Sequence, residues 1–204
     1  MSNHVFVASS LDGFIAGPDG DIQWLEEIPN PGGSDYGYVQ FMESIDALVM
    51  GRKTFEKVAG FPEWPYPKPV FVLSRTLKQV PERFNGKAEL FNGTPGQIVH
   101  HLAEQGYHEL YVDGGEVIRE FLAEDLVDTM TITWVPILLG DGIPLFGNSA
   151  FRRQFKLMKT EEFNHHLIQA VYKRVREVQS HSLPIFAESD DNRTVCVRIN
   201  HQEV

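Results

Sequence analysis

Three short polar turns, each directly after an apolar run, carry the residues that could do chemistry. They are Gly51-Arg52-Lys53-Thr54, Ser74-Arg75 and Asp113-Gly114-Gly115-Glu116. In open parallel sheets, ligands bind at the carboxyl ends of the strands. A glycine pair that opens a helix lets backbone N–H groups approach a pyrophosphate, and arginine makes charge-assisted bonds to phosphate, although a glycine pair is also typical of a tight turn. The chemistry we expect at these turns is the binding of an anionic nucleotide.

The basic residues in two of the turns indicate which nucleotide is bound. A P-loop would need a second glycine before Gly51, so the sequence does not favour a kinase or an ATPase. An NAD site presents Asp or Glu to the ribose 2′-hydroxyl, whereas Arg52 and Arg75, with Lys53 and Ser74 beside them, suit a 2′-phosphate. We therefore expect NADP or NADPH. The alternative is that these basic residues form an ordinary solvated helix face.

The elements that must position these turns alternate between short apolar runs and helical patterns. Thr94-Pro95 predicts the start of a helix that ends at Gly106, and a second helix follows Gly115. This alternation predicts an α/β fold, with a mostly parallel central sheet and helices on both faces. The predicted strands are His4–Ala8, Ala47–Met50, Pro69–Leu73, Ala88–Phe91 and Glu109–Val112.

The pattern changes in the C-terminal half of the chain. Asp128–Leu139 and Phe155–Val175 predict longer strands, the second interrupted by a hairpin near Asn164-His165, so an antiparallel hairpin is expected to close the sheet. We expect residues 1–178 to form one domain and residues 179–204 to form a tail. The tail contains a good strand former, "TVCVRI", for which pairing with its own sheet edge, pairing with another subunit and disorder all stay open.

Composition limits the classes of partner. The 204 residues contain 18 Lys and Arg against 28 Asp and Glu, a net charge of −10, which does not favour nucleic acid or anionic membranes as partners. Cys196 is the only cysteine, and no apolar run is long enough to span a membrane. The adjacent histidine pairs at 100–101 and 165–166 point apart, so no metal is expected. We expect a cytoplasmic protein, a homodimer, with a small-molecule partner.

Taken together, the motifs resemble the dihydrofolate reductase-like family, which includes the C-terminal reductase domain of riboflavin biosynthesis. The resemblance covers about residues 3 to 176 and is closest to small stand-alone members. It rests on these segments occurring in the family's order: "VASSLDGFIAG", "GPDGDIQW", "MGRKTFE", "VLSR", "YVDGGEVIREFL", "DTMTITWVP" and "LLGDGIPLF". The resemblance implies a three-layer fold and an NADPH-dependent oxidoreductase.

The resemblance also implies a cofactor site. Ala8 would contact the nicotinamide amide, and Gly17 would begin a mobile loop that ends at Trp24. Ser74 and Arg75, after Leu73, would hold the adenosine 2′-phosphate. The residues implied at the other phosphates are Gly51, Arg52, Lys53, Thr54, Gly114, Gly115, Glu116 and Val117.

The proton donor has two candidates in the sequence. Asp35 resembles the family's substrate-binding acid, and Thr133 matches a threonine that supports this acid, although Asp35 could also be an ordinary helix N-terminal residue. Asp12, in a stretch that faces the substrate in riboflavin-pathway reductases, is the rival, although an Asx turn is an alternative role. The resemblance makes Ser10 and Asp12 candidates for binding substrate, and Trp24 could stack on a flat heterocycle or belong to the core.

The predicted activity is an NADPH-dependent reduction of a pyrimidine- or pteridine-like heterocycle, or of a related imine or carbonyl. The riboflavin-pathway 5-amino-6-(5-phosphoribosylamino)uracil reductase is one candidate, but its basic helix is not found where this chain has "YVQFMESIDA". Dihydrofolate reductase activity is an alternative, and so is a protein that binds NADP without turnover.

Overall fold

A computed structural model of the chain describes residues 1–147 and 151–176. The helices are α1 (Tyr38–Glu43), α2 (Arg52–Val58), α3 (Pro95–Glu104) and α4 (Gly115–Ala123), with short 3₁₀ helices at Gln23–Leu25 and Glu82–Phe84. The strands are β1 (Ser2–Ser10), β2 (Phe14–Ala16), β3 (Ala47–Gly51), β4 (Val70–Leu73), β5 (Ala88–Phe91), β6 (Glu109–Asp113), β7 (Thr129–Val135), β8 (Ile143–Pro144), β9 (Gln154–Phe163) and β10 (Leu167–Val175). The expected tail, 179–204, lies outside the described residues.

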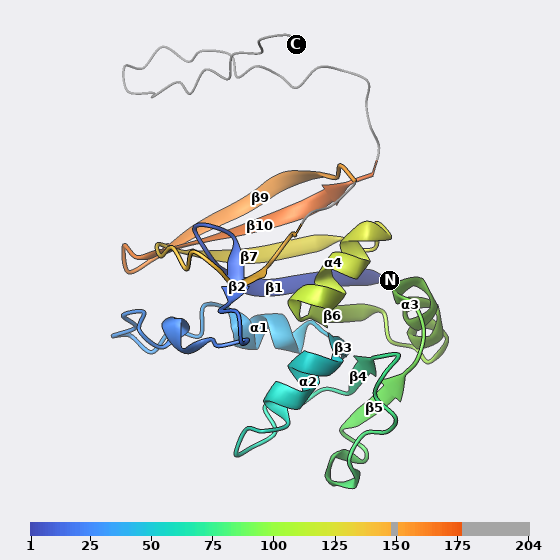
Figure 1. Cartoon of the computed structure of the whole chain (residues 1–204). Helices are drawn as coiled ribbons and strands as arrows, with labels where there is room; N and C mark the ends of the chain where they lie inside the picture. Colours follow the sequence, from blue (N-terminus) through green and yellow to red (C-terminus); the bar gives the residue numbers. More distant parts are fainter. Residues whose placement is uncertain (148–150, 177–204) are drawn as a thin grey trace.

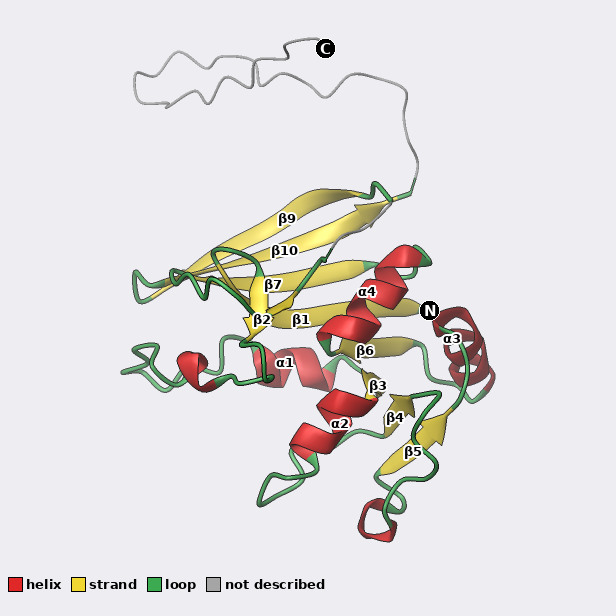
Figure 2. Ribbon diagram, viewed as in Figure 1, coloured by secondary structure: helices red, strands yellow, loops and turns green. Residues whose placement is uncertain are grey.

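Within this described part, eight strands form one sheet in the order β5-β4-β3-β6-β1-β7-β10-β9 (Figure 1). The strands from β5 to β7 run parallel, whereas β10 is antiparallel to β7 and β9 is antiparallel to β10. The parallel sheet and its antiparallel edge hairpin are therefore confirmed, and helices pack around the sheet as Figure 2 shows. The parallel strands bring the ends of β3, β4 and β6 to the same edge.

The core lies on both faces of this sheet, because successive buried side chains of each parallel strand point to opposite faces. In β3, Val49 packs in the cluster that contains α3 and α4, whereas Leu48 packs in the cluster that contains α1 and α2. The start of α3 follows the sequence prediction: the Thr94 hydroxyl accepts from the Gln97 N–H, and the Gln97 side chain accepts from the Thr94 N–H. This reciprocal capping satisfies two N–H groups that would otherwise lack partners.

Two elements differ from the sequence prediction. The helix expected to open at Asp35 begins at Tyr38, because Tyr36 (φ 54°) and Gly37 (φ 80°) are left-handed and cannot continue a right-handed helix. The strand expected to reach Leu139 ends at Val135, because the next residue is proline, which has no N–H for a strand ladder. The chain then forms β8, which pairs with β2 in a small second sheet that was not predicted.

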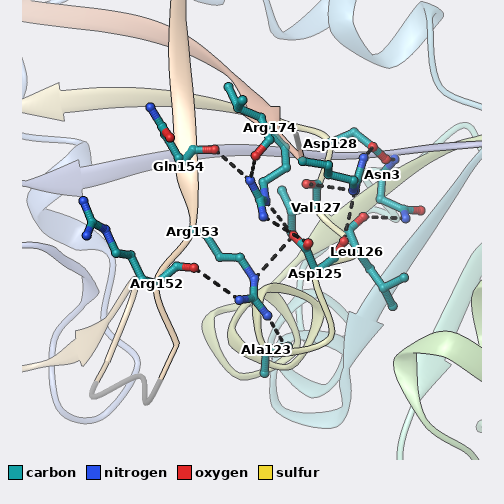
Figure 3. A network of polar contacts seen from close by, with 12 residues as sticks. Asn3, Ala123, Asp125, Leu126, Val127, Asp128, Arg152, Arg153, Gln154 and Arg174 are labelled. Carbon is teal, nitrogen blue, oxygen red and sulfur yellow. Dashed lines mark hydrogen bonds and ion pairs between the residues drawn. The ribbon is translucent and has the colours of Figure 1, made fainter. Parts of the chain in front are cut away.

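Charged contacts join the β9–β10 hairpin to the turn after α4 (Figure 3). Asp125 accepts from Arg174 Nε at 2.6 Å and from Arg174 Nη2 at 3.0 Å, and Arg153 Nε lies 3.4 Å from the same carboxylate. Asp125 has a φ of 58°, a left-handed conformation that aspartate tolerates better than most residues. We call Asp125, Arg153 and Arg174 the hairpin clasp.

Candidate active site

The carboxyl ends of β3 and β4, with the start of α4, line a cavity of about 320 Å³. The three turns singled out in the sequence thus lie around one cavity, although Thr54, Gly114 and Gly115 are not among its lining residues. Its lining residues are Gly51, Arg52, Lys53, Leu73, Ser74, Arg75, Thr76, Gly93, Glu116, Val117 and Glu120.

Glycines at this edge leave room that a side chain would fill. A Cβ at Gly51 would lie 3.1 Å from Val117 Cγ2, and a Cβ at Gly114 would overlap the Thr54 hydroxyl. Gly114 also has a φ of 92°, which favours glycine. The close approach of α2 to the turn before α4 therefore depends on Gly114.

Charges of both signs line the cavity. Arg75 and Lys53 are exposed, whereas Arg52 donates through Nη1 to both carboxylate oxygens of Glu56, at 2.8 and 2.9 Å. Burial raises the pKa of the Glu120 carboxyl above its ordinary value, while the nearby Arg75 charge acts against this rise. Arg75 is thus placed to meet an anion, and Arg52 would have to share its charge with Glu56.

The loop from Gly17 to Trp24 closes on itself and touches α2. The Gly17 N–H donates to the Asp21 carbonyl at 2.8 Å, and Lys57 Nζ donates to the Gly20 carbonyl at 2.5 Å. Trp24 is only 6% exposed and packs with the core around Val135. In this arrangement the indole is a core side chain, so its stacking on a substrate stays a prediction.

Asp12 and Ser10 form a polar turn after β1. The Ser10 hydroxyl donates to Asp12 Oδ1 at 2.6 Å, and Asp12 also accepts from the N–H groups of Leu139 and Gly140, at 3.2 and 2.7 Å. The hydrogen bond from Ser10, together with those from the two N–H groups, lowers the pKa of Asp12, while partial burial opposes this change. Both N–H donors lie more than 120 residues further along the chain, so Asp12 joins the turn after β1 to the segment after β7 instead of forming a local Asx turn. These bonds keep Asp12 an ionised acceptor.

Asp35 and Thr133 do not hydrogen-bond to each other. The exposed Asp35 carboxylate accepts from the N–H groups of Val39 and Gly37, at 2.7 and 3.1 Å, and these bonds lower its pKa. Thr133 is buried, and its hydroxyl accepts from Gln169 Nε2 at 3.0 Å. The arrangement is that of a carboxylate at a helix N-terminus, and it favours the charged form of Asp35 over a proton donor.

A third carboxyl group, Asp113, lies in one of the three turns but was not among the acids predicted to donate the proton. It ends β6 directly before the glycine pair, and Tyr66 Oη donates to its Oδ2 at 3.3 Å. Burial raises the pKa of Asp113, although hydrogen bonds from the Gly114 N–H and from Tyr66, with the Tyr111 hydroxyl nearby, oppose the rise. The signal in the sequence was an acid at the end of a buried strand that borders the expected site.

Aromatic rings surround this carboxyl group. Tyr111 Oη donates to the Phe6 carbonyl at 3.0 Å, and Tyr38 packs edge-on against the Phe6 ring, with 5.7 Å between the ring centroids. Burial and the Asp113 charge raise the pKa of Tyr38 to about 12. Across residues 1–147 and 151–176, no group of three or more His, Cys, Asp or Glu side chains could hold a metal ion. Asp113 is thus a half-buried acid with a raised pKa at the end of β6, and it does not itself line the cavity.

Comparison with known proteins places this architecture in a family. The family model described as the RibD C-terminal domain matches residues 4–168. The chain belongs to the RibD C-terminal domain family. A solved structure of a protein assigned provisionally to riboflavin biosynthesis, from Shewanella sp. PV-4, is 47% identical with a TM-score of 0.83, and the match covers 86% of this chain and all of that one.

Two more distant solved structures show the same fold. One is the diaminohydroxyphosphoribosylaminopyrimidine deaminase/5-amino-6-(5-phosphoribosylamino)uracil reductase of Thermotoga maritima, 18% identical with a TM-score of 0.67, covering 85% of this chain and 56% of that one. The other is dihydrofolate reductase from Enterococcus faecalis complexed with NADP(H), also 18% identical, with a TM-score of 0.59 and coverage of 85% and 96%.

The family and the fold confirm the resemblance seen in the motifs. The chain is an oxidoreductase with a dihydrofolate reductase-like fold. It is a reductase of the pyrimidine reductase type. No helix in the described ranges is both long and apolar enough to cross a membrane. These findings leave the cofactor and the substrate to be argued from the site.

Proposed function

We propose that this chain is an NADPH-dependent reductase of a pyrimidine- or pteridine-like heterocycle, or of a related imine or carbonyl. The observation that carries the proposal is the cavity at the carboxyl ends of β3 and β4, with Arg75 exposed in it and the half-buried acid Asp113 at the end of β6, the strand beside β3. Reduction of a C=N or C=O bond requires a cofactor that supplies a hydride and an acid that supplies a proton.

The residues present fit NADPH. Lys53 and the open N–H groups at the start of α2 and α4 would hold the phosphates, and Ser74 and Arg75 would hold the adenosine 2′-phosphate. Bound NADPH supplies a hydride from C4 of its nicotinamide. Gly51 and Gly114 serve this binding by keeping the turns free of side chains. The NADP(H) complex of the Enterococcus dihydrofolate reductase fold supports this choice of cofactor.

We assign to Asp113 the donation of a proton to the substrate. Its raised pKa favours the protonated form, whereas the lowered pKa values of Asp12 and Asp35 favour carboxylates that cannot donate. Tyr66 fixes the orientation of the Asp113 carboxyl group through its hydrogen bond. Asp113 would donate its proton to the substrate heteroatom beside the carbon that accepts the hydride, and Asp12 and Asp35 would shape the loops around the substrate.

Calorimetric titration with NADPH and with NADH tests the cofactor assignment. Replacing Arg75 by Ala should weaken NADPH binding by about 1.5–3 kcal/mol, the contribution of a hydrogen bond to a charged group, and should leave NADH binding nearly unchanged. Arg83→Ala is the matched control, because Arg83 is an exposed arginine that donates to the Ala59 carbonyl and does not line the cavity. Equal weak binding of both cofactors would contradict the 2′-phosphate site.

The substrate class is tested by NADPH oxidation assays. Dihydrofolate and 5-amino-6-(5-phosphoribosylamino)uracil are the first two compounds to compare, because the relatives with this fold include enzymes named for both activities. The family match and the Shewanella structure favour the riboflavin precursor. NADPH binding without turnover of any heterocycle would instead favour a non-catalytic NADP-binding protein.

The same proposal includes a cytoplasmic homodimer with a small-molecule substrate. A single cysteine, Cys196, suits a reducing compartment, and the net charge of −10 suits neither nucleic acid nor an anionic membrane as a partner.

A further inference from the structure

Basic and acidic side chains are unevenly distributed along the chain. Residues 1–51 carry eight acidic side chains and no lysine or arginine. This segment includes β1, β2, the loop of residues 17–24 and α1. The first basic residue in the chain is Arg52, which lines the cavity together with Lys53 and Arg75. The positive charge that an anion needs is therefore present at the cavity and missing from these N-terminal elements.

The N-terminal elements lie around Asp113, beside which the proposed function places the substrate. Tyr38 of α1 is close enough to Asp113 that the carboxylate charge adds to the effect of burial in raising the pKa of the tyrosine. The ring of Phe6, in β1, packs edge-on against the Tyr38 ring, and the Phe6 carbonyl accepts from Tyr111 Oη. Both α1 and β1 therefore form part of the surroundings of this acid.

The polar groups around Asp113 are phenols. Burial is the main cause that raises the pKa values of Tyr66 and Tyr111, and the charges that add to the rise are those of Asp113 and of neighbouring tyrosines. Trp64 packs edge-on against Tyr66, with 5.6 Å between the ring centroids. Phenol hydroxyls and aromatic faces suit the polar edge and the flat face of an uncharged heterocycle, whereas a phosphate is best bound by arginine or lysine.

Two further lysines near these elements have other partners. Lys57 Nζ donates to the Gly20 carbonyl at 2.5 Å, which holds the loop of residues 17–24 against α2. Backbone N–H groups, and then the Lys68 charge, lower the pKa of Asp46. Asp46 precedes β3, so Lys68 lies at the opposite end of this strand from the cavity. An anionic group buried on the substrate side would lack a counter-charge, which is costly.

We propose that the substrate of this reductase is a heterocycle that carries no phosphate or carboxylate group. This inference rests on the proposed function, because that function places the substrate beside Asp113. The family match favours a pyrimidine ring, and the charges bear only on what is attached to the ring. The cations at the cavity would meet the phosphates of the cofactor, and the tyrosines would meet an uncharged substrate.

A matched pair of compounds tests this proposal. NADPH oxidation is measured, at saturating NADPH, with 5-amino-6-(5-phosphoribosylamino)uracil and with the same compound after removal of its phosphate. The kcat/KM of the phosphate-free compound should be higher by roughly tenfold or more, because the acidic segment repels the phosphate. Raising the salt from about 0.1 M to about 1 M should reduce this difference, because salt screens the repulsion.

Charge-neutralising variants locate the repulsion. Asp19→Asn/Asp21→Asn removes two exposed charges from the loop of residues 17–24, and the asparagine at position 21 can still accept from the Gln23 N–H. The preference for the phosphate-free compound should narrow by roughly two- to fivefold. Glu82→Gln/Glu89→Gln is the matched control. It changes the net charge equally at two exposed sites near the β5 margin of the sheet, and it should leave the preference unchanged.

The outcomes separate this inference from the proposed function. A higher kcat/KM for the phosphorylated compound, or a kcat/KM for it that falls with salt, would overturn the charge argument while leaving the reductase activity in place. Equal narrowing by both double variants would also overturn it, because only the net charge would then matter. Turnover of neither compound, although calorimetry shows that NADPH binds, would remove the proposed pyrimidine substrate and this inference with it.

Discussion

At the scale of single residues, the fold gives three aspartates different acid strengths. Asp12 and Asp35 each accept backbone N–H hydrogen bonds, which stabilise the carboxylate and lower the pKa. Asp113 is enclosed by tyrosines, and burial raises its pKa. All three are Asp in a turn in the sequence, so the difference arises from neighbours that are distant along the chain, such as Leu139 for Asp12 and Tyr66 for Asp113.

Replacing Asp113 by Asn separates catalysis from stability. Because the folded state holds the Asp113 proton more tightly than the unfolded state, the unfolding free energy of the wild type falls as the pH rises from the ordinary aspartate pKa through the raised value. Asp113→Asn removes this loss, so the variant should be more stable than the wild type at neutral pH. Its kcat should fall by roughly 10²–10⁴-fold, the usual contribution of a general acid.

Urea unfolding at several pH values and steady-state assays measure these two effects. Asp12→Asn and Asp35→Asn are the comparison variants, and neither should show a gain in stability at neutral pH, because their lowered pKa values mean that ionisation stabilises the fold. If Asp35→Asn abolishes turnover while Asp113→Asn keeps it, the proton belongs to Asp35.

At the scale of elements, the hairpin clasp is where charge most directly supports the fold. The Arg174 side chain is only 9% exposed and pairs its charge with Asp125, while its Nη1 also donates to the carbonyls of Gln154 and Val175. Replacing Asp125 by Ala would leave the Arg174 charge partly buried and unpaired, a cost of roughly 3 kcal/mol, and would place alanine at a φ of 58°. Asp125→Asn is the matched variant, since asparagine tolerates the left-handed backbone but lacks the charge.

Chemical unfolding as a function of pH measures how much the hairpin clasp contributes to the free energy of unfolding. The hydrogen bond from Arg174 and its charge lower the pKa of Asp125, so its stabilising effect is present above the ordinary aspartate pKa and is lost as the pH falls through the lowered value. The wild type should therefore lose its advantage over Asp125→Asn in acid. An advantage of the same size at all pH values would show that the charge contributes nothing.

The same scale shows which elements the sequence could predict. Five of the six parallel strands and the start of α3 follow from local patterns, because apolar runs and the Thr94-Pro95 cap need no information from elsewhere. The pairing of β2 with β8 joins segments more than 120 residues apart, which no local pattern reports. The late start of α1 depends on the left-handed Tyr36, a conformation that the residue type does not announce.

The position of the cavity could be predicted from the sequence, because parallel strands bring their carboxyl ends to the same edge of the sheet. Gly51, Ser74, Arg75 and Val117 therefore meet as expected. The raised pKa of Asp113 could not be predicted in this way. The hydrogen bond between Tyr66 and Asp113 joins an irregular segment to β6, and the burial that raises the pKa of Asp113 exists only when the sheet is complete.

At the scale of the whole molecule, an anionic cofactor would bind to local positive charges on a protein whose net charge is −10. Most of the acidic residues lie farther from the cavity than Arg75 and Lys53, which line it. At about 0.1 M salt the Debye length is about 10 Å, so the distant charges are already screened, and at about 1 M it is about 3 Å. Raising the salt over this range should therefore weaken mainly the local attraction.

We accordingly expect the Kd for NADPH to rise by roughly three- to tenfold between these salt concentrations, since each exposed ion pair contributes about 0.2–1 kcal/mol. The Kd for NADH should rise less, because NADH lacks the 2′-phosphate that Arg75 would meet. Fluorescence titration of both cofactors in the same buffers measures the difference, with Arg75→Ala as the control in which the two salt dependences should coincide. If NADPH binds more tightly as salt rises, the negative surface controls the approach of the cofactor and the cavity's cations do not.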